Sequence, residues 1–233
     1  MSGEPELSLA IPLYNEEENA AQVAMGLVQA FDACQLPCEL VLVNNGSRDG
    51  TGRVIEELAS QRAGLRAVQL SENQGYGGGI LAGLRLCTGR FVGYTWGDAQ
   101  VSAEDHVRVF QKLKDEPLDL CKAVRVERQD GLKRRLITVA YNRTFPVFFR
   151  VGSGDVNGCP KIFRKEALDR LALASRDWFI DAEAMIKSRQ AGYRIGEVPV
   201  VFRARSRGAS NVRWGTVLEF AYNMVRYRLR GSF

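Results

Sequence analysis

Asp98 and Gln100 place a carboxylate and an amide oxygen two positions apart, at the polar end of the segment FVGYTWGDAQ (91–100), which reads as a strand. Residues two apart share a face of an extended segment, so we expect both side chains to point the same way. Oxygen ligands of this kind bind hard divalent cations, and such a cation can neutralise an anionic leaving group. The spacing therefore predicts a Mg²⁺ or Mn²⁺ seat at Asp98 and Gln100, with Asp98 also a candidate catalytic residue.

Short polar residues also end two earlier apolar runs, in the segments LSLAIPLYNEEENA and CELVLVNNGSRDGT. Each segment reads as a buried strand that turns into a helix, as in a parallel sheet. Ligands of such sheets collect beyond the carboxyl ends of the strands. Both turns are therefore predicted to line one nucleotide-type site, to which they contribute Pro12, Tyr14, Asn15, Glu16, Asn44, Asn45, Gly46, Ser47 and Asp49.

Helix initiation is a second interpretation of these turns. Asn15 and Glu18 have the three-residue spacing of a capping box, and Asp49 and Thr51 are suitable caps for the second helix. Capping does not account for Pro12. Both interpretations stay open for the four capping candidates.

A strand is predicted at 65–70, where LRAVQL alternates, and the glycine-rich segment SENQGYGGGILAGLRLCTG follows it. Its glycines allow tight turns and close approach of the backbone to a ligand. The residues after them read as a helix that ends at Gly89. Close packing of that helix on the sheet is the alternative use of the same glycines.

The composition limits the classes of protein. The 233 residues, 45% of them hydrophobic, suffice for one large α/β domain with a sizeable core. A net charge of +5, with Lys and Arg denser in the second half of the chain, points to an anionic partner.

Five cysteines without a C-x-x-C pair indicate reduced thiols in a cytosolic chain. The single histidine, His106, is expected in a helix or on the surface, and it makes a Ser-His or multi-histidine zinc mechanism hard to build.

These segments resemble the family-2 glycosyltransferases of the GT-A fold, whose members open with P-x-Y-N-E-E, continue with V-D-D-G-S-x-D-x-T and usually carry D-x-D-x-Q. The resemblance implies an α/β fold with a mostly parallel sheet flanked by helices, a nucleotide-diphosphate sugar donor and a Mg²⁺ or Mn²⁺ cofactor. It supports Asp98 and Gln100 as the metal ligands. The candidate donor contacts are Pro12, Tyr14, Glu16, Asn44, Asn45, Asn73, Gly75, Tyr76, Trp96 and Gly97.

Three carboxylates of the family motifs are replaced in this chain. Trp96 stands where the first aspartate of D-x-D-x-Q is usual, and its presence is expected to weaken the metal seat without abolishing it. Asn44 and Asn45 replace both carboxylates of V-D-D-G-S. Because an amide both donates and accepts while a carboxylate only accepts, the choice of nucleobase stays open among uracil, guanine and thymine.

The segment FIDAE resembles the F-x-D-A-E turn of the family and places Asp181 and Glu183 at the start of a predicted helix, where the helix dipole favours negative charge. We expect both to face the site as candidate catalytic residues, with capping as the alternative. Asp155, in the segment GDVNGCPKIFRKEALDRL, is a further candidate for placing the acceptor or the metal.

The resemblance narrows to the branch that transfers sugars to dolichyl, undecaprenyl or other polyprenyl phosphates. Members of this branch have an arginine at the end of a strand, which corresponds to Arg125. An R-x-x-x-S/T motif on the following helix corresponds to Arg134 with Thr138, and an arginine in a late loop corresponds to Arg205. Guanidinium groups match phosphate oxygens, so these residues are the candidate acceptor-phosphate clamp. A phosphate is already an anion and attacks the sugar C1 without a base, and family membership implies inversion.

Two alternatives stay open. A soluble hydroxyl acceptor would need a general base, for which Asp181 or Glu183 is the candidate. A nucleotide-sugar-binding protein that has lost turnover would also fit the replaced carboxylates.

Residues 1–210 are predicted to form the catalytic domain, and residues 211–233 an amphipathic helix at a membrane surface. A helix that forms a dimer or packs on the core is the alternative interpretation of the tail. The segment 130–151, both apolar and cationic, is expected to pack on the sheet or to lie at such a surface. No run of 18 apolar residues and no secretory signal occurs. The chain is therefore predicted to be cytoplasmic and peripheral to the cytoplasmic face of a membrane, with a membrane-anchoring protein or a second copy as candidate partner and no nucleic acid.

Overall fold

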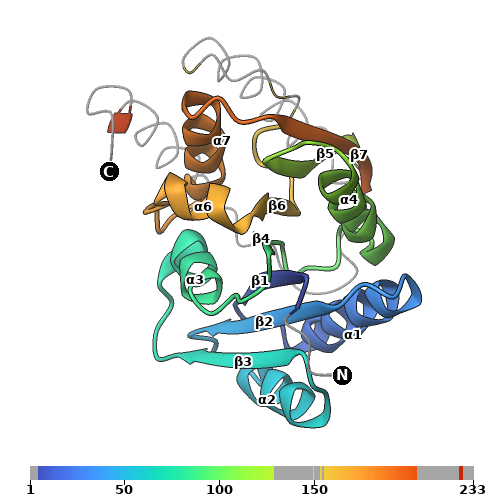
Figure 1. The fold of residues 1–233 in the computed structure, drawn as a ribbon. Coiled ribbons are helices and arrows are strands. Elements are labelled where there is room, and N and C mark those ends of the chain that lie inside the picture. The colour runs from blue at the N-terminus through green and yellow to red at the C-terminus, as the bar shows by residue number, and fades with distance from the viewer. Residues whose placement is uncertain (1–4, 129–148, 150–152, 154, 204–225, 228–233) are drawn as a thin grey trace.

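The computed structural model describes residues 5–128, 149, 153, 155–203 and 226–227. Helices lie on both faces of one central sheet (Figure 1). The elements, in chain order, are β1 Leu7–Leu13, α1 Glu17–Ala33, β2 Cys38–Asn45, α2 Thr51–Gln61, β3 Leu65–Leu70, α3 Gly75–Leu84, β4 Phe91–Tyr94, α4 Ala103–Asp115, β5 Leu120–Arg128, β6 Lys161–Arg164, α6 Lys165–Leu171, α7 Ile180–Gln190 and β7 Ile195–Phe202.

The sheet has seven strands in the order β3-β2-β1-β4-β6-β5-β7. β6 is antiparallel to both of its neighbours, β4 and β5, and the other pairs are parallel. The predicted α/β fold with a mostly parallel sheet is therefore confirmed. β6 is also the strand through which the four N-terminal strands are joined to β5 and β7.

The first two strands are buried along almost their whole length, because helices cover both faces of the sheet and apolar residues are needed on each. Their parallel register pairs Leu13 with Asn44, and the register of β2 with β3 pairs Asn44 with Gln69. The carboxyl ends of β1, β2 and β3 consequently meet at one rim of the sheet. The sequence predicted this shared rim.

Two apolar clusters hold the helices on the sheet. One cluster contains Leu9, Phe31 and Phe110 and packs α1, α2 and α4 on one face. The other contains Ile80 and Phe179 and packs α3, α6 and α7 on the opposite face. Burial of about 25 cal/mol for each Å² of apolar surface makes these two clusters the main stabilising contribution.

Several predicted boundaries were wrong. Helix α1 begins at Glu17, and the predicted cap Asn15 has a φ of 54°, so the capping box does not form. Helix α3 ends at Leu84 rather than at Gly89, because the chain must turn there to enter β4. Asp49 accepts a hydrogen bond from the Thr51 amide at 3.0 Å, although Gly50 occupies the cap position of α2.

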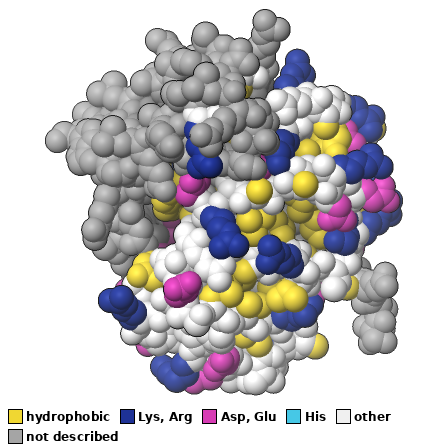
Figure 2. All heavy atoms as spheres, turned by 90° about the vertical axis from the view of Figure 1, so that its left-hand side faces the viewer, with side chains coloured by type: hydrophobic (Ala, Val, Ile, Leu, Met, Phe, Trp, Pro, Cys, Tyr) yellow, Lys and Arg dark blue, Asp and Glu magenta, His cyan; other side chains and the backbone are white. Residues whose placement is uncertain are grey.

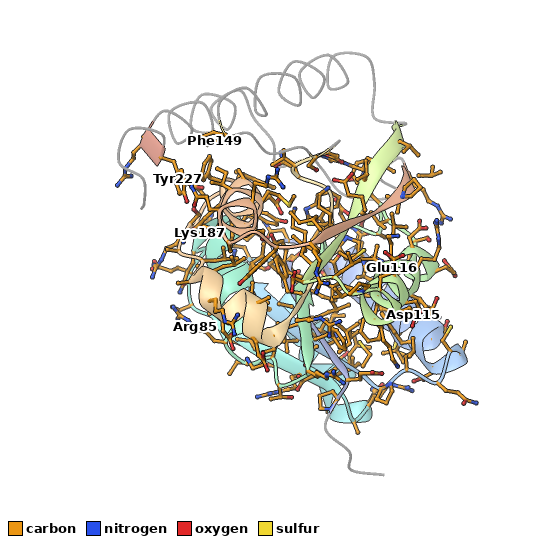
Figure 3. All side chains as sticks on the ribbon, turned by 45° about the horizontal axis from the view of Figure 1, so that its top comes forward. Arg85, Asp115, Glu116, Phe149, Lys187 and Tyr227 are labelled. Atoms are coloured by element: carbon orange, nitrogen blue, oxygen red, sulfur yellow. The ribbon has the colours of Figure 1, made fainter. Side chains whose placement is uncertain are left out.

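Arg134, Thr138, Arg205 and most of the predicted tail helix lie outside the described residues. The described residues within those parts of the chain include Phe149 and Tyr227, whose side chains lie close together (Figure 3). The rings of Phe149 and Tyr227 are 6.1 Å apart, and Tyr227 also packs on Phe179 at 5.5 Å. Tyr227 is 3% exposed and belongs to the second apolar cluster. Among the residues that the structure describes, no helix is both long and apolar enough to span a membrane.

Candidate active site

The turns after β1 and β2 are joined to each other by hydrogen bonds. The Asn15 side-chain oxygen accepts from the Arg48 amide at 2.9 Å, and the Asn15 amide donates to Ser47 Oγ at 3.0 Å. The Glu16 amide donates to Thr51 Oγ1 at 2.9 Å. The polar residues that the sequence offered as caps therefore fix one turn against the other. They build the rim on which Pro12, Tyr14 and Glu16 were predicted.

Asn44, which is 9% exposed, uses both ends of its amide within the protein. Its oxygen accepts from the Ser47 amide at 3.0 Å, and its nitrogen donates to Gln69 Oε1 at 2.6 Å. Gln69 in turn donates to the Gly52 carbonyl at 3.0 Å and to Glu56 at 2.9 Å. Asn44 is thereby linked to helix α2.

Asn45, which is 3% exposed, faces the turn formed by residues 73–75. Its oxygen accepts from the Gln74 amide at 3.0 Å. Its nitrogen donates to the Gly75 carbonyl at 2.9 Å and to Asn73 Oδ1 at 3.3 Å. The structure brings Asn45, Asn73 and Gly75 together, as the sequence predicted.

The glycines at the start of α3 permit close contact with the loop before α7. Gly75 has a φ of +80°, and a Cβ there would collide with the Arg176 carbonyl. The Gly78 amide donates to that same carbonyl at 2.9 Å. Beside it, Tyr76 stacks on Trp178 with centroids 4.5 Å apart. Gly83, later in α3, packs against Ala10 of β1 and Val43 of β2. The glycines therefore serve close packing, and their approach to a ligand stays a prediction.

Tyr76 was predicted as a donor contact, but its hydroxyl points into the protein and lies 3.9 Å from Cys159 Sγ. Burial, and then the nearby Asp181 charge, raise the pKa of Tyr76 well above its ordinary value. The Tyr76 ring therefore packs the site from beneath.

Asp98 and Gln100 lie in a bend rather than in an extended segment, so the predicted geometry was wrong. Strand β4 ends at Tyr94, and Ala99 has a φ of 56°. Asp98 Oδ1 accepts from the Gln100 amide at 3.2 Å, which closes the bend. The Gln100 side-chain nitrogen donates to the Arg203 carbonyl at 2.8 Å, and this fixes the plane of the amide that carries Oε1. Before the bend, Gly97 packs against Leu13 of β1.

The donor set of this bend fits a hard divalent cation in chemistry, because it offers a carboxylate and an amide oxygen. Within the described part of the chain, no three His, Cys, Asp or Glu residues gather into a metal cluster. A cation at this bend would therefore need further oxygen ligands, and a diphosphate has oxygens of the right kind.

Trp96, which replaces the usual aspartate, packs against Arg125 and Phe202. The Trp96 and Phe202 rings meet edge to face at 5.4 Å, and the Arg125 guanidinium lies 5.2 Å from each ring centroid. Cation–π contacts of this kind are worth about 0.5–2 kcal/mol. Trp96 therefore supports Arg125 in place of supplying a ligand.

Arg125 forms a two-point ion pair with Asp155. Its Nε and Nη2 atoms lie 2.6 and 2.7 Å from the two carboxylate oxygens. Burial alone would raise the pKa of Asp155, but the hydrogen bonds and charge of Arg125 lower it to about 2. Arg125 also lies inside β5, which continues to Arg128, and not at the predicted strand end.

Two lysines are completely buried beneath the segment 155–160, and the sequence interpretation missed both. Lys122 Nζ donates to the Asp155 carbonyl at 2.5 Å and lies 3.4 Å from Glu197. Lys161 Nζ donates to the Gly158 carbonyl at 2.9 Å. Burial, followed by the charge of Lys161, lowers the pKa of Lys122. The segment that carries Asp155 is thereby fixed from below.

Asp181 and Glu183 lie in the first turn of α7, as predicted, but both are buried, at 2% and 0% exposure. Asp181 Oδ1 accepts from Lys161 Nζ at 2.5 Å and from the Tyr94 hydroxyl at 3.1 Å. Glu183 accepts from the Ala174 and Ser175 amides at 3.1 and 2.8 Å. These contacts hold α7 and the loop before it in place.

Thr95 and His106 form a buried pair that the sequence interpretation did not predict, and His106 is 4% exposed within α4. Its two ring nitrogens lie 2.7 Å from Thr95 Oγ1 and 2.7 Å from the Ser102 carbonyl. The carbonyl can only accept, so Nδ1 donates to it and Nε2 accepts from the threonine hydroxyl. Burial lowers the pKa of His106 to about 4, so the ring is neutral. Its partner Thr95 precedes the bend at Asp98, which connects His106 to the predicted metal seat.

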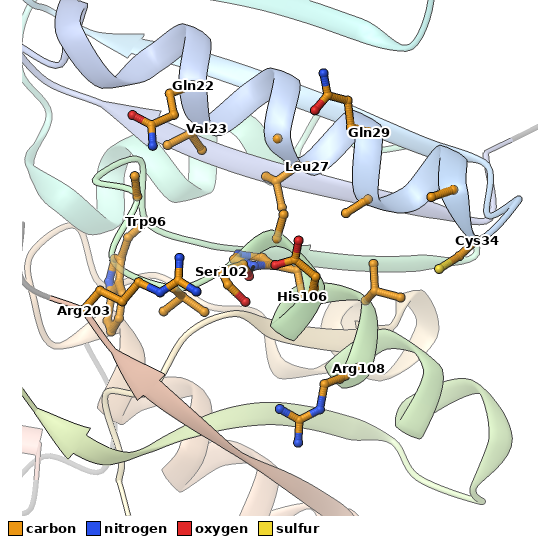
Figure 4. A pocket seen from close by; sticks show the side chains of 18 residues that line it. Gln22, Val23, Leu27, Gln29, Cys34, Trp96, Ser102, His106, Arg108 and Arg203 are labelled. Atoms are coloured by element: carbon orange, nitrogen blue, oxygen red, sulfur yellow. Dashed lines mark hydrogen bonds between the residues drawn. The ribbon is translucent and has the colours of Figure 1, made fainter. Parts of the chain in front are cut away.

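A groove of about 670 Å³ lies between α1 and α4 (Figure 4). Trp96 and Arg203 lie at one end of it and Cys34 at the other. Trp96, a predicted contact of the sugar donor, is part of its lining.

On the face drawn in Figure 2, Lys and Arg side chains are interspersed with acidic and hydrophobic ones.

The chain belongs to glycosyl transferase family 2, because residues 8–172 match the model of that family. It is a glycosyltransferase of the GT-A fold, as the motifs predicted. The fold is shared with several solved structures of low sequence identity.

Glucosyl-3-phosphoglycerate synthase from Mycobacterium tuberculosis, solved with Mn²⁺, UDP and phosphoglyceric acid, is 20% identical, with a TM-score of 0.75 over 98% of this chain and 80% of that one. The mannosyltransferase PcManGT from Pyrobaculum calidifontis, solved with GDP-Man and Mn²⁺, is 21% identical, with a TM-score of 0.61 over 89% of this chain and 59% of that one. S. aureus TarS 1–349 with UDP-GlcNAc is 17% identical, with a TM-score of 0.63 over 96% of this chain and 65% of that one.

Proposed function

We propose that the protein transfers a sugar, with inversion at the anomeric carbon, from a nucleoside diphosphate sugar to a water-soluble acceptor hydroxyl. The observation that carries the acceptor assignment is the buried Arg125–Asp155 pair. The guanidinium gives two of its five N–H groups to the Asp155 carboxylate. Its charge is thereby balanced inside the protein, which makes it a weaker site for a lipid phosphate than an arginine without a counter-charge. A solved neighbour that contains phosphoglyceric acid supports a soluble acceptor.

The metal in this proposal is Mg²⁺ or Mn²⁺, held by Asp98 and Gln100 together with the diphosphate of the donor. Two neighbours contain Mn²⁺, which supports this choice. When bound, the cation supplies charge neutralisation of the departing diphosphate. The bond between the sugar C1 and the diphosphate oxygen breaks as the acceptor oxygen forms its bond to C1.

The proton of the acceptor hydroxyl needs a base, and we assign Asp177 to this role. Asp181 and Glu183 are buried and already accept several hydrogen bonds. Asp177 is partly exposed, which distinguishes it from Asp181 and Glu183, although its Oδ1 accepts from the Phe179 amide at 2.8 Å. Its backbone adjoins Gly75 and Gly77 at the start of α3, so the loop that carries this carboxylate lies next to the predicted donor contact Gly75.

A polyprenyl phosphate is the second candidate acceptor. The sequence positions Arg134, Thr138 and Arg205 favour it, as does the cationic and apolar pattern of residues 130–151 and 211–233. In that case the protein acts at the cytoplasmic face of a membrane, and the acceptor phosphate needs no base.

A transfer screen separates these proposals. The protein is incubated with UDP-, GDP- or dTDP-sugars and Mn²⁺ or Mg²⁺, and either 3-phosphoglycerate and other soluble alcohols or a short polyprenyl phosphate. Product with a soluble alcohol supports the first proposal, and product formed only with the lipid phosphate supports the second. Nucleotide binding without turnover on any acceptor would contradict both and would favour a binding protein.

A further inference from the structure

Asn45 has two backbone partners of opposite type, the Gln74 amide at 3.0 Å and the Gly75 carbonyl at 2.9 Å. The Gln74 N–H needs an acceptor and the Gly75 carbonyl needs a donor. An amide side chain supplies both. Its second N–H points to Asn73 Oδ1 at 3.3 Å. Both hydrogens and the oxygen of the Asn45 amide are therefore engaged inside the protein.

Asn44 makes two hydrogen bonds, one through its nitrogen and one through its oxygen, and both join it to its own side of the rim. It donates to Gln69 Oε1 at 2.6 Å and accepts from the Ser47 amide at 3.0 Å. Gln69 cannot reverse its amide freely, because its nitrogen already donates to the Gly52 carbonyl and to Glu56. Neither partner of Asn44 belongs to the turn at residues 73–75, which Asn45 contacts through the Gln74 amide and the Gly75 carbonyl.

We propose that Asn45 is a positioning residue that holds the turn at residues 73–75 and does not select the nucleobase of the donor. The inference rests on the proposed function only for the identity of the ligand. Position 45 needs a side chain that accepts from the Gln74 amide and donates to the Gly75 carbonyl, as an amide does. Selection among bases is accordingly made by groups other than the Asn45 side chain.

Restoring the carboxylates of the usual family motif tests this proposal. In Asn45→Asp the new carboxylate faces the Gly75 carbonyl, so an attractive contact becomes a repulsive one in a buried place. In Asn44→Asp the new carboxylate faces Gln69 Oε1, so the repulsion acts on Gln69 and helix α2 rather than on the turn at residues 73–75. The two variants make the same chemical change at adjacent buried positions, so each is a matched control for the other.

The first measurement needs no ligand. Amide hydrogen exchange of residues 72–79 is compared in the wild type and the two variants. We expect exchange there to rise about tenfold or more in Asn45→Asp and about twofold in Asn44→Asp. Unchanged exchange in Asn45→Asp would overturn the assignment of Asn45 to this turn.

The second measurement is the dissociation constant of UDP, GDP and dTDP in the presence of Mn²⁺, by calorimetry. We expect Asn45→Asp to weaken every nucleotide that the wild type binds, by a common factor of about ten or more. The ratios among the three nucleotides should stay within about twofold of the wild-type ratios. A relative gain of about fivefold for one nucleotide would overturn the proposal, because Asn45 would then read the base.

The two measurements separate failure of this inference from failure of the proposed function. If the wild type binds none of the three nucleotides, the proposed donor chemistry is contradicted. Hydrogen exchange still decides whether Asn45 holds the turn.

Discussion

At the residue scale, a carboxylate that the family motif usually supplies has been exchanged for an aromatic ring. Trp96 packs on Phe202 and covers the Arg125 guanidinium, so the position has a supporting role. Asp98 is left as the carboxylate of the bend, assisted by the Gln100 amide. This arrangement makes the proposed metal seat depend strongly on one residue.

Replacing Asp98 by Ala should remove metal-dependent turnover, with a loss of about 100-fold or more in kcat/KM. The measurement is the rate of transfer as a function of Mn²⁺ concentration. Asp115→Ala, which removes an exposed carboxylate at the end of α4, is the control and should behave as the wild type. Turnover of Asp98→Ala at the wild-type rate, with the same Mn²⁺ response, would refute the metal assignment.

Asp177→Asn should lower kcat for a hydroxyl acceptor by about 100-fold or more, because the amide cannot take a proton. The affinity for the nucleotide should change little. The matched control is Asp169→Asn, an exposed carboxylate on α6 that lies 3.6 Å from Lys165. An unchanged kcat in Asp177→Asn would remove this residue from the mechanism.

At the element scale, His106 joins the end of β4 to the start of α4. The neutral ring accepts from Thr95 and donates to the Ser102 carbonyl. A protonated ring could no longer accept from the threonine. The connection that contains the metal bend therefore depends on the proton state of one helix residue.

Acid should weaken the fold through His106. Its pKa falls from 6.5 to about 4 on folding, so between these values the unfolded chain holds a proton that the folded protein lacks. This contribution to stability is complete above pH 6.5 and is lost as the pH falls to 4, by at most about 1.4 kcal/mol per pH unit. Urea unfolding of the wild type and of His106→Gln across this range checks the prediction. Equal pH slopes for the two proteins would contradict it.

The contact between α7 and β6 depends on the buried Asp181–Lys161 pair, 2.5 Å apart. Asp181→Asn would leave the Lys161 charge without a counter-charge, so we expect the free energy of unfolding to fall by about 3–5 kcal/mol. Equilibrium denaturation measures this loss. Asp177→Asn, four residues earlier at a partly exposed position, should lose less than about 1 kcal/mol, because the amide oxygen can still accept from the Phe179 amide. Equal losses in the two variants would be inconsistent with a structural role specific to Asp181.

At the scale of the whole molecule, the sequence predicted the strand–turn–helix units well. The apolar runs at residues 7–13 and 38–45 could belong only to buried elements, and their polar ends indicated the rim. The sequence interpretation missed the buried Lys122 and Lys161, although each interrupts an apolar strand and so needs a buried partner. Those partners lie up to 75 residues away, as with Lys122 and Glu197, and only the folded chain brings them together.

The same limit applied to the predicted site. The spacing of Asp98 and Gln100 was visible, but the bend that sets their directions depends on a φ of 56° at Ala99. An alanine in the sequence does not predict a positive φ. Asp181 and Glu183 were placed correctly in the first turn of α7. Their burial follows from contacts with Lys161 and with residues 174–175, which no local pattern reveals.

The position of β6 has a consequence for how the chain is made. This strand fills the edge of β4, yet about 70 residues of synthesis separate the end of β4 from the end of β6. At about 5–20 residues per second, the ribosome needs several seconds to deliver it. During that interval the nascent chain presents an uncovered strand edge, a known template for mispairing with other chains. Cotranslational folding of this protein should therefore be most vulnerable to aggregation before residue 164 emerges.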